Sequence, residues 1–209
     1  MNLKEEIKLN FPKFPDEVIE FCLFPIAETE GGLPSKENAW DTRVFGEKLN
    51  FWHDSEWKKT EVNLNSIPFS KMYVDTMKGM QDAYIDGIEN SYWKHLGENG
   101  KRRFQKCLTY ILKNSKFPVA PILITDEIGR HQVMDGNHRF LGLIVAERFY
   151  KEYQTLSLEN RQKFLDGFKI TSLKAPDSIQ EVWICKPNWE NNQNAQTRNL
   201  LRLSGYGDF

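Results

Sequence analysis

The sequence predicts a mixed α+β fold, in which helices pack on a small sheet. Three observations lead to this class. Residues 121–134 have the pattern of a β-hairpin, residues 101–113 have the apolar spacing of an amphipathic helix, and a more apolar helix begins directly after the hairpin. A chain of 209 residues is long enough for one such domain with extensions and a real core.

Residues 1–57 are unusually rich in aromatic side chains, and we expect them to pack on the main domain as an extension rather than fold alone. A short helix over about 16–23 would place Val18, Phe21 and Cys22 on one face. The later aromatic residues of this extension are Trp40, Phe45, Phe51, Trp52 and Trp57.

The main domain is expected at residues 58–187. Its first strand is predicted at Thr60–Ile67, where apolar residues alternate before Pro68. The cleanest amphipathic helix is Lys101–Lys113, which we expect to begin after Asn99-Gly100. The apolar residues of that helix, at i, i+3, i+4, i+7 and i+8, are Phe104, Cys107, Leu108, Ile111 and Leu112.

The hairpin opens the second half of the domain. Its strands are predicted at Pro121–Thr125 and Arg130–Met134, joined by a tight turn at Asp126–Gly129. Helices are expected next at about 138–152 and 158–166.

The second of these helices has a start signal and a stop signal. Ser157 is the expected N-cap, and Gly167 is expected just beyond the last turn. The last strand is predicted at Gln180–Cys185, and the tail at 188–209 is expected to be loose apart from a short helix near 195–203.

A polar corner, Asp135-Gly136-Asn137-His138-Arg139, joins the hairpin to the helix that follows it. A glycine corner at a helix N-terminus is a ready anion site. The first-turn N–H groups are unpaired, the helix dipole is positive there, and glycine lets a ligand approach the backbone closely. With His138 and Arg139 in the same corner, phosphate is the expected ligand.

The polar residues of this corner each have a functional and a structural interpretation. Arg139 offers a planar fork to two phosphate oxygens, or it pairs with Asp135 or a carbonyl. His138 donates to a phosphate or moves a proton near neutral pH, or it packs and hydrogen-bonds locally. Asp135 acts as a general base, orients His138 or holds Mg²⁺ with a nucleotide, or it forms an Asx turn. Gly136 serves the backbone shape under either interpretation.

The hairpin followed by Asp-Gly-Asn-His-Arg resembles the signature of the ParB/sulfiredoxin superfamily. Its members carry Gly-Glu-Arg-Arg, Gly-Cys-His-Arg or Asp-Gly-x-His-Arg at this strand-to-helix corner. The resemblance also covers the helix at 101–113 and, more weakly, strands near 61–67 and 180–186. It implies the compact ParB/sulfiredoxin fold. It also implies a nucleoside triphosphate, ATP or CTP, whose phosphates are held with Mg²⁺ by Gly136, Asn137, His138 and Arg139.

Three departures narrow what the resemblance implies. In sulfiredoxins the position of Asn137 is the catalytic cysteine, so sulfinic acid reduction is not expected. ParB-type CTPases carry a second phosphate motif, Glu-Asn-x-Gln-Arg, after their last strand. Residues Glu159–Lys163 are close to it in letters but precede the predicted last strand, and we interpret them as part of a surface helix. Only a short tail follows residue 187, which disfavours a ParB-like clamp with a helix-turn-helix domain.

Three functions remain in competition. The favoured one is NTP hydrolysis or Mg-dependent phosphoryl transfer to a small acceptor, as in the free-serine kinases of this superfamily, with Asp135 and His138 as catalytic residues. The second is a ParB-like nuclease or DNA-binding protein, and the third is a non-catalytic interaction module. The resemblance implies that Tyr73–Trp93 helps to form the pocket, with an aromatic residue stacked on the base. The sequence does not select the nucleotide, the acceptor or an oligomeric state.

Composition bounds the partners and the setting. A formal net charge of −1 argues against a chain-wide basic footprint for DNA, and we interpret the local cluster Lys101-Arg102-Arg103 as a solvated helix face. The cysteines Cys22, Cys107 and Cys185 are far apart and odd in number, which favours a reducing, intracellular setting.

The histidines and the apolar runs bear on metal binding and on membrane association. The four histidines show no metal-ligand spacing, so no metal ligands are assigned. No apolar run approaches the roughly 18–20 residues that span a bilayer, and the N-terminus lacks a signal-peptide apolar region. We therefore expect a cytoplasmic protein that does not associate with membranes.

Overall fold

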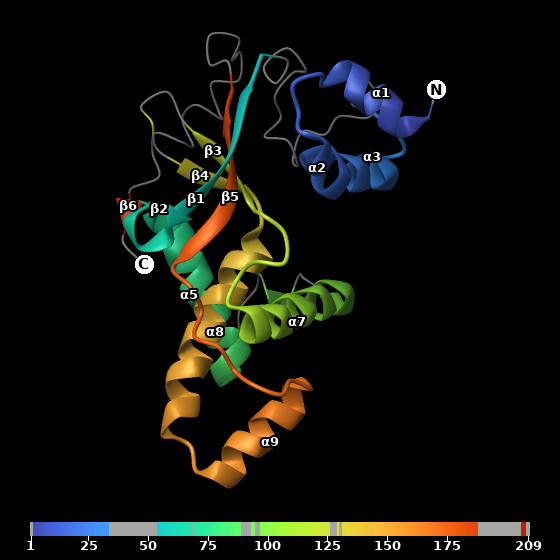
Figure 1. Cartoon of the computed structure of the whole chain (residues 1–209). Coiled ribbons are helices and arrows are strands. Elements are labelled where there is room, and N and C mark those ends of the chain that lie inside the picture. The colour runs from blue at the N-terminus through green and yellow to red at the C-terminus, as the bar shows by residue number, and fades with distance from the viewer. Residues whose placement is uncertain are drawn as a thin grey trace. The chain divides into compact units, whose positions relative to one another are not determined.

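The computed structural model describes residues 2–33, 54–67, 69–88, 93–94, 97–125, 129, 131–187 and 206–207. The described chain is mixed α+β with a small open sheet, so the predicted class is confirmed (Figure 1). It divides into two compact units. Unit 1 comprises Met1–Thr60, Ile122–Asp135 and Trp183–Gly205, and unit 2 comprises Glu61–Pro121, Gly136–Val182 and Tyr206–Phe209.

The sheet has four strands in the order β1-β5-β3-β4. The strands are β1 (Glu56–Asn63), β3 (Ile122–Thr125), β4 (His131–Asp135) and β5 (Ile179–Lys186). The predicted hairpin is confirmed, because β3 pairs with β4 antiparallel. On its other side β3 pairs with β5 in parallel, with Leu123 opposite Ile184. Most of the predicted hairpin turn lies outside the described residues.

Unit 1 also contains the N-terminal helical segment, which shares one apolar core with the sheet strands. Its elements are α1 (Leu3–Asn10), α2 (Asp16–Val18), the π-helical turn η1 (Ile19–Leu23) and α3 (Phe24–Glu30). A capping box between Asn2 and Glu5 starts α1, a helix that the aromatic composition did not reveal. Apolar side chains of these helices cluster with Ile122, Ile124 and Cys185.

One face predicted for the N-terminal segment is wrong. Val18 and Cys22 are buried, but Phe21 is 55% exposed. The reason is the π-helical turn, whose wider i→i+5 hydrogen-bonding changes the direction of side chains from that of a regular α-helix. The later aromatic residues Trp40, Phe45, Phe51 and Trp52 lie outside the described part of the chain.

Unit 2 is built mainly from helices. They are α5 (Lys71–Asp86), α7 (Gly97–Asn114), α8 (Asn137–Thr155) and α9 (Leu158–Phe168), with the antiparallel pair β2 (Phe69–Ser70) and β6 (Tyr206–Gly207). The α7 and α8 helices approach closely at Gly142, where an added Cβ would lie 3.1 Å from Cδ1 of Ile111 and 3.6 Å from Sγ of Cys107. Apolar residues of both helices are fully buried, among them Phe104, Leu108, Leu141 and Val145.

Several element boundaries differ from the sequence predictions for physical reasons. The first strand covers Glu56–Asn63 instead of Thr60–Ile67, because the Asn63 side chain accepts the Asn65 N–H at 3.0 Å and starts a 3-10 turn. The α7 helix begins at Gly97, before Asn99-Gly100.

The predicted N-cap of α9 is confirmed, since Ser157 accepts from the Asn160 N–H at 3.4 Å. Gly167, expected beyond the end of that helix, is instead inside it. The helix ends because Lys169 adopts a left-handed conformation with φ of 55°. The strand predicted at Gln180–Cys185 is confirmed as β5, whereas the helix expected near 195–203 lies outside the described residues.

Among the described helices, none combines the length and the apolar character needed to cross a membrane.

Candidate phosphate-binding corner

The corner contains the start of the 19-residue helix α8. Gly136 is the N-cap residue and, being a glycine, supplies no side-chain cap hydrogen bond. Its carbonyl accepts both the Arg139 N–H at 2.8 Å and the Phe140 N–H at 3.1 Å. With the helix dipole positive here, this turn of unit 2 provides the backbone environment that an anion requires.

Position 136 requires glycine, because any side chain there would be strained and would contact its neighbours too closely. Its backbone is in a left-handed conformation, with φ of 119° and ψ of 14°. A Cβ at this position would lie 2.4 Å from Cβ of Pro121 and 3.1 Å from Nη1 of Arg139. The backbone shape and the neighbouring proline ring therefore both require glycine.

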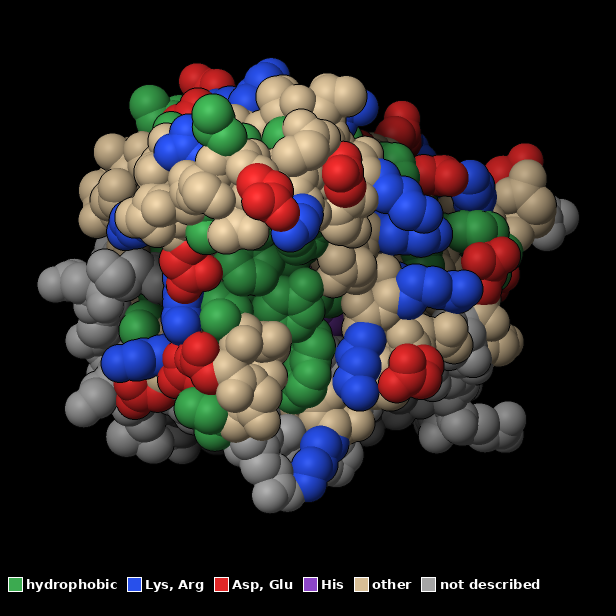
Figure 2. Space-filling view, turned by 90° about the horizontal axis from the view of Figure 1, so that it is seen from below, with side chains coloured by type: hydrophobic (Ala, Val, Ile, Leu, Met, Phe, Trp, Pro, Cys, Tyr) green, Lys and Arg blue, Asp and Glu red, His purple; other side chains and the backbone are tan. Residues whose placement is uncertain are grey.

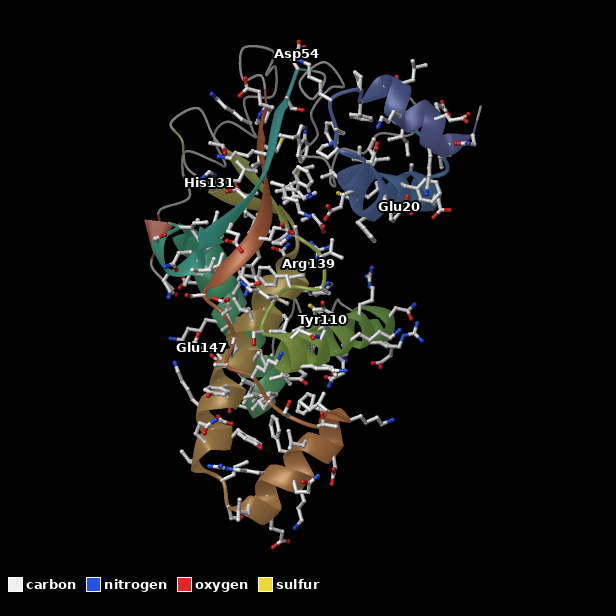
Figure 3. All side chains as sticks on the ribbon, viewed as in Figure 1. Glu20, Asp54, Tyr110, His131, Arg139 and Glu147 are labelled. Carbon is white, nitrogen blue, oxygen red and sulfur yellow. The ribbon has the colours of Figure 1, made fainter. Side chains whose placement is uncertain are left out.

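The Arg139 guanidinium is held over the start of its own helix. Nη1 of Arg139 lies 3.1 Å from the position that a Cβ on residue 136 would occupy. The guanidinium charge therefore lies beside the N-cap residue rather than out in solvent. Figure 3 shows Arg139 at this end of α8, with Glu147 further along the same helix. A guanidinium fork and a helix N-terminus thus lie together, and each of these features favours an anion.

Asn137 contributes a buried polar atom without a hydrogen bond. Its Oδ1 is inaccessible to solvent and has no partner among the described residues. A buried acceptor without a donor costs about 1–3 kcal/mol, so a ligand that supplies the donor would be stabilised here. The amide oxygen suits a hydroxyl or a hydrated cation, and the amide rotated by 180° offers N–H groups to a phosphate.

Asp135 and His138 lie on either side of Gly136 in the sequence. Asp135 is the last residue of β4 in unit 1, opposite Ile122, and precedes Gly136 directly in the chain. His138 is half-buried in the first turn of α8. Of the five predicted site residues, unit 2 holds Gly136, Asn137, His138 and Arg139 together on one helical turn.

Cys107 is a further residue of the site's surroundings. Burial raises the pKa of its thiol from 9.0 to about 11, and the positive charge of Arg139 opposes that increase. The sequence places Cys107 on the apolar face of a helix, which predicts core packing. Its proximity to Arg139 depends on how α7 and α8 pack, and no local sequence signal indicates it.

We expect the Cys107 thiol to lower the free energy of unfolding at high pH. The folded thiol has the raised pKa, so its contribution to stability is complete below pH 9 and is lost as pH rises through 11. The free energy of unfolding should fall by about 1.4 kcal/mol per pH unit in this range relative to Cys107→Ser. Urea denaturation of both proteins at pH 8, 9, 10 and 11 measures this, and parallel pH profiles would contradict it.

In the Tyr73–Trp93 segment, which is expected to help form a pocket, Tyr84 and Asp86 contact other residues of the protein. Tyr84 lies 4.9 Å from Phe104 and 5.5 Å from Trp93 between ring centroids, and its hydroxyl donates to Gln105 at 2.6 Å. Asp86, an acidic residue of the same segment, accepts two hydrogen bonds from Arg148 at 3.0 and 3.2 Å.

The ParB-like letters at Glu159–Lys163 also have a structural explanation. They lie in α9, where Arg161 donates to the carbonyls of Leu156 and Gln154 at 3.1 and 2.6 Å. Arg161 thereby caps the C-terminal end of α8, at the opposite end from Gly136. The interpretation of this run as a surface helix is confirmed.

Within the described ranges, no three His, Cys, Asp or Glu side chains are grouped to hold a metal ion. A Mg²⁺ ion at the corner would therefore take most of its oxygen ligands from phosphates and water, as this ion commonly does.

Comparisons with protein-family models, with curated proteins and with solved structures found no match to this chain.

Proposed function

We propose that this protein binds a nucleoside triphosphate and catalyses its hydrolysis or the transfer of a phosphoryl group to a small acceptor. The observation that carries this proposal is the start of α8, where a glycine N-cap, the helix N-terminus and the Arg139 guanidinium lie together. The resemblance of Asp135–Arg139 to the ParB/sulfiredoxin signature supports the same ligand and suggests that fold.

In this proposal the α8 corner binds and positions the phosphates. Arg139 contacts two oxygens of one phosphate, and first-turn N–H groups that are not donated to the Gly136 carbonyl contact another. The buried amide of Asn137 gains a partner from the ligand or its hydration shell. When bound with the nucleotide, Mg²⁺ would supply charge neutralisation of the phosphates.

Proton transfer is assigned to the two ionisable residues beside the glycine. Asp135 accepts a proton from the attacking water or acceptor hydroxyl. His138 donates to a phosphate oxygen as negative charge develops in the transition state. In the sequence, Asp135 directly precedes Gly136 and His138 lies two residues after it.

The test is calorimetric titration of ATP, CTP and GTP, each with Mg²⁺, into wild type and Arg139→Gln. We expect saturable binding of at least one nucleotide by wild type. The variant should bind at least tenfold more weakly, since a charge-assisted hydrogen bond contributes about 1.5–3 kcal/mol. Nucleotide that binds should then be assayed for phosphate release, with Asp135→Asn as the variant that lowers turnover.

Lys151→Gln is the matched control for the charge. It removes one cation from the exposed side of the same helix, where Lys151 pairs with Glu147 at 2.8 Å. Its affinity should equal that of wild type. A folded wild type that binds none of the nucleotides, or an Arg139→Gln variant of unchanged affinity, would overturn the proposal.

A further inference from the structure

After Glu98 in its first turn, the exposed face of α7 is basic without any acidic side chain. Between Asn99 and Asn114 the helix has five cations and no carboxylate, in a chain whose net charge is −1. Four exposed residues at i, i+3, i+7 and i+10 lie within an arc of about 80° on this helix. We call them the basic stripe: Arg103, Lys106, Tyr110 and Lys113.

Within the part of the chain that the structure describes, the cations of the basic stripe form no ion pairs. In the described part of the chain, no carboxylate pairs with Arg103, Lys106 or Lys113. The lysines of α8 and α9 are paired, as Lys151–Glu147 at 2.8 Å and Lys163–Glu159 at 2.6 Å. Like charges on successive turns destabilise a helix slightly, so the stability of α7 does not explain the stripe.

Tyr110 stands between the cations with an available ring. It is 42% exposed, and within the described residues its ring stacks on no other aromatic side chain. Lys106 precedes it by one helical turn and Lys113 follows it by one. An exposed aromatic ring between cations is the arrangement that stacks a base while its backbone phosphates are neutralised.

The basic stripe borders the side of α7 that faces the phosphate-binding corner. Cys107 adjoins Lys106 in sequence and lies one turn after Arg103, and the charge of Arg139 acts on its thiol. Figure 3 labels Tyr110 on α7 and Arg139 at the start of α8. Figure 2 shows Lys and Arg side chains on the right of the face seen from below, with Asp and Glu side chains among them.

We propose that the basic stripe binds a single-stranded nucleic acid. From Arg103 to Lys113 it measures about 15 Å along the helix, which exceeds what the phosphates of one nucleotide would occupy and suits a chain of regularly spaced anions. The tyrosine selects a single strand, because a ring can stack only on an unpaired base. This proposal goes beyond nucleotide binding at the corner and does not depend on it.

The test measures the salt dependence of binding. The anisotropy of a fluorescein-labelled 20-nucleotide oligo-dT is titrated with wild type and with the double variant Arg103→Gln/Lys106→Gln at 50–300 mM NaCl. For two lost phosphate contacts we expect the slope of log K against log salt to fall by about 1.4, equivalent to roughly 25-fold for each decade of salt concentration. Tyr110→Ala should lose roughly 5- to 150-fold in affinity with an unchanged slope.

Two controls separate this site from general charge attraction and from the corner. Lys151→Gln/Lys163→Gln removes the same charge from paired lysines and should bind as wild type does. An abasic strand of equal length should bind wild type and Tyr110→Ala equally. The proposal would be overturned if wild type does not bind the oligonucleotide, or if the double variant has the same slope of log K against log salt as wild type. It would also be overturned if duplex DNA binds as tightly as the single strand, or if polyglutamate competes as well as a nucleic acid does.

Discussion

Replacing Gly136 with alanine should destabilise the protein by about 3 kcal/mol. The new Cβ would lie 2.4 Å from Cβ of Pro121, whose ring cannot rotate away, and the backbone has a φ of 119° that alanine rarely adopts. Backbone strain and overpacking each cost about 1–3 kcal/mol, and here they act together. Urea denaturation followed by circular dichroism measures the change in the free energy of unfolding.

Gly167→Ala is the matched control for this substitution. Gly167 lies inside α9, and an added Cβ there meets no atom within 4 Å. The same change should therefore stabilise the protein by about 0.5–1 kcal/mol, because alanine favours the helix more than glycine does. If the free energies of unfolding of Gly136→Ala and wild type differ by less than 0.5 kcal/mol, the proposed shape of the corner is wrong.

Replacing Phe140 with alanine should cost about 3–5 kcal/mol, the range for removing a fully buried phenylalanine. Phe140 is only 2% exposed and follows Arg139 directly in α8. Its ring centroid lies 5.3 Å from those of Phe69 and Phe117, both in edge-to-face arrangements. The cavity would lie beneath the first turn of α8, so nucleotide binding at the corner should weaken together with stability.

Phe21→Ala provides the comparison for burial. Phe21 carries the same side chain but is 55% exposed in unit 1, and its loss should cost less than about 1 kcal/mol. Chemical denaturation of both variants and wild type measures the difference. Equal losses for Phe140→Ala and Phe21→Ala would show that the helix turn does not depend on the buried ring.

The sequence by itself determined the parts of the fold that depend on local pattern. The hairpin strands, the helix of α7 and the Ser157 cap could be predicted because apolar periodicity and capping chemistry act over a few neighbouring residues. The corner could be located for the same reason, since Asp135–Arg139 is contiguous and a glycine before an apolar helix has a direct backbone meaning.

Only the tertiary structure decided which residues from distant segments join that corner. Pro121 lies against Gly136 because β3 pairs with β4 with Ile122 opposite Asp135. Cys107 comes under the charge of Arg139 because α7 packs on α8 at Gly142. Such contacts depend on side-chain fit between elements far apart in the chain, which local periodicity does not encode. The exposure of Phe21 was likewise decided by a π-helical turn, because that change in winding directs a side chain away from the face that regular helical spacing predicts.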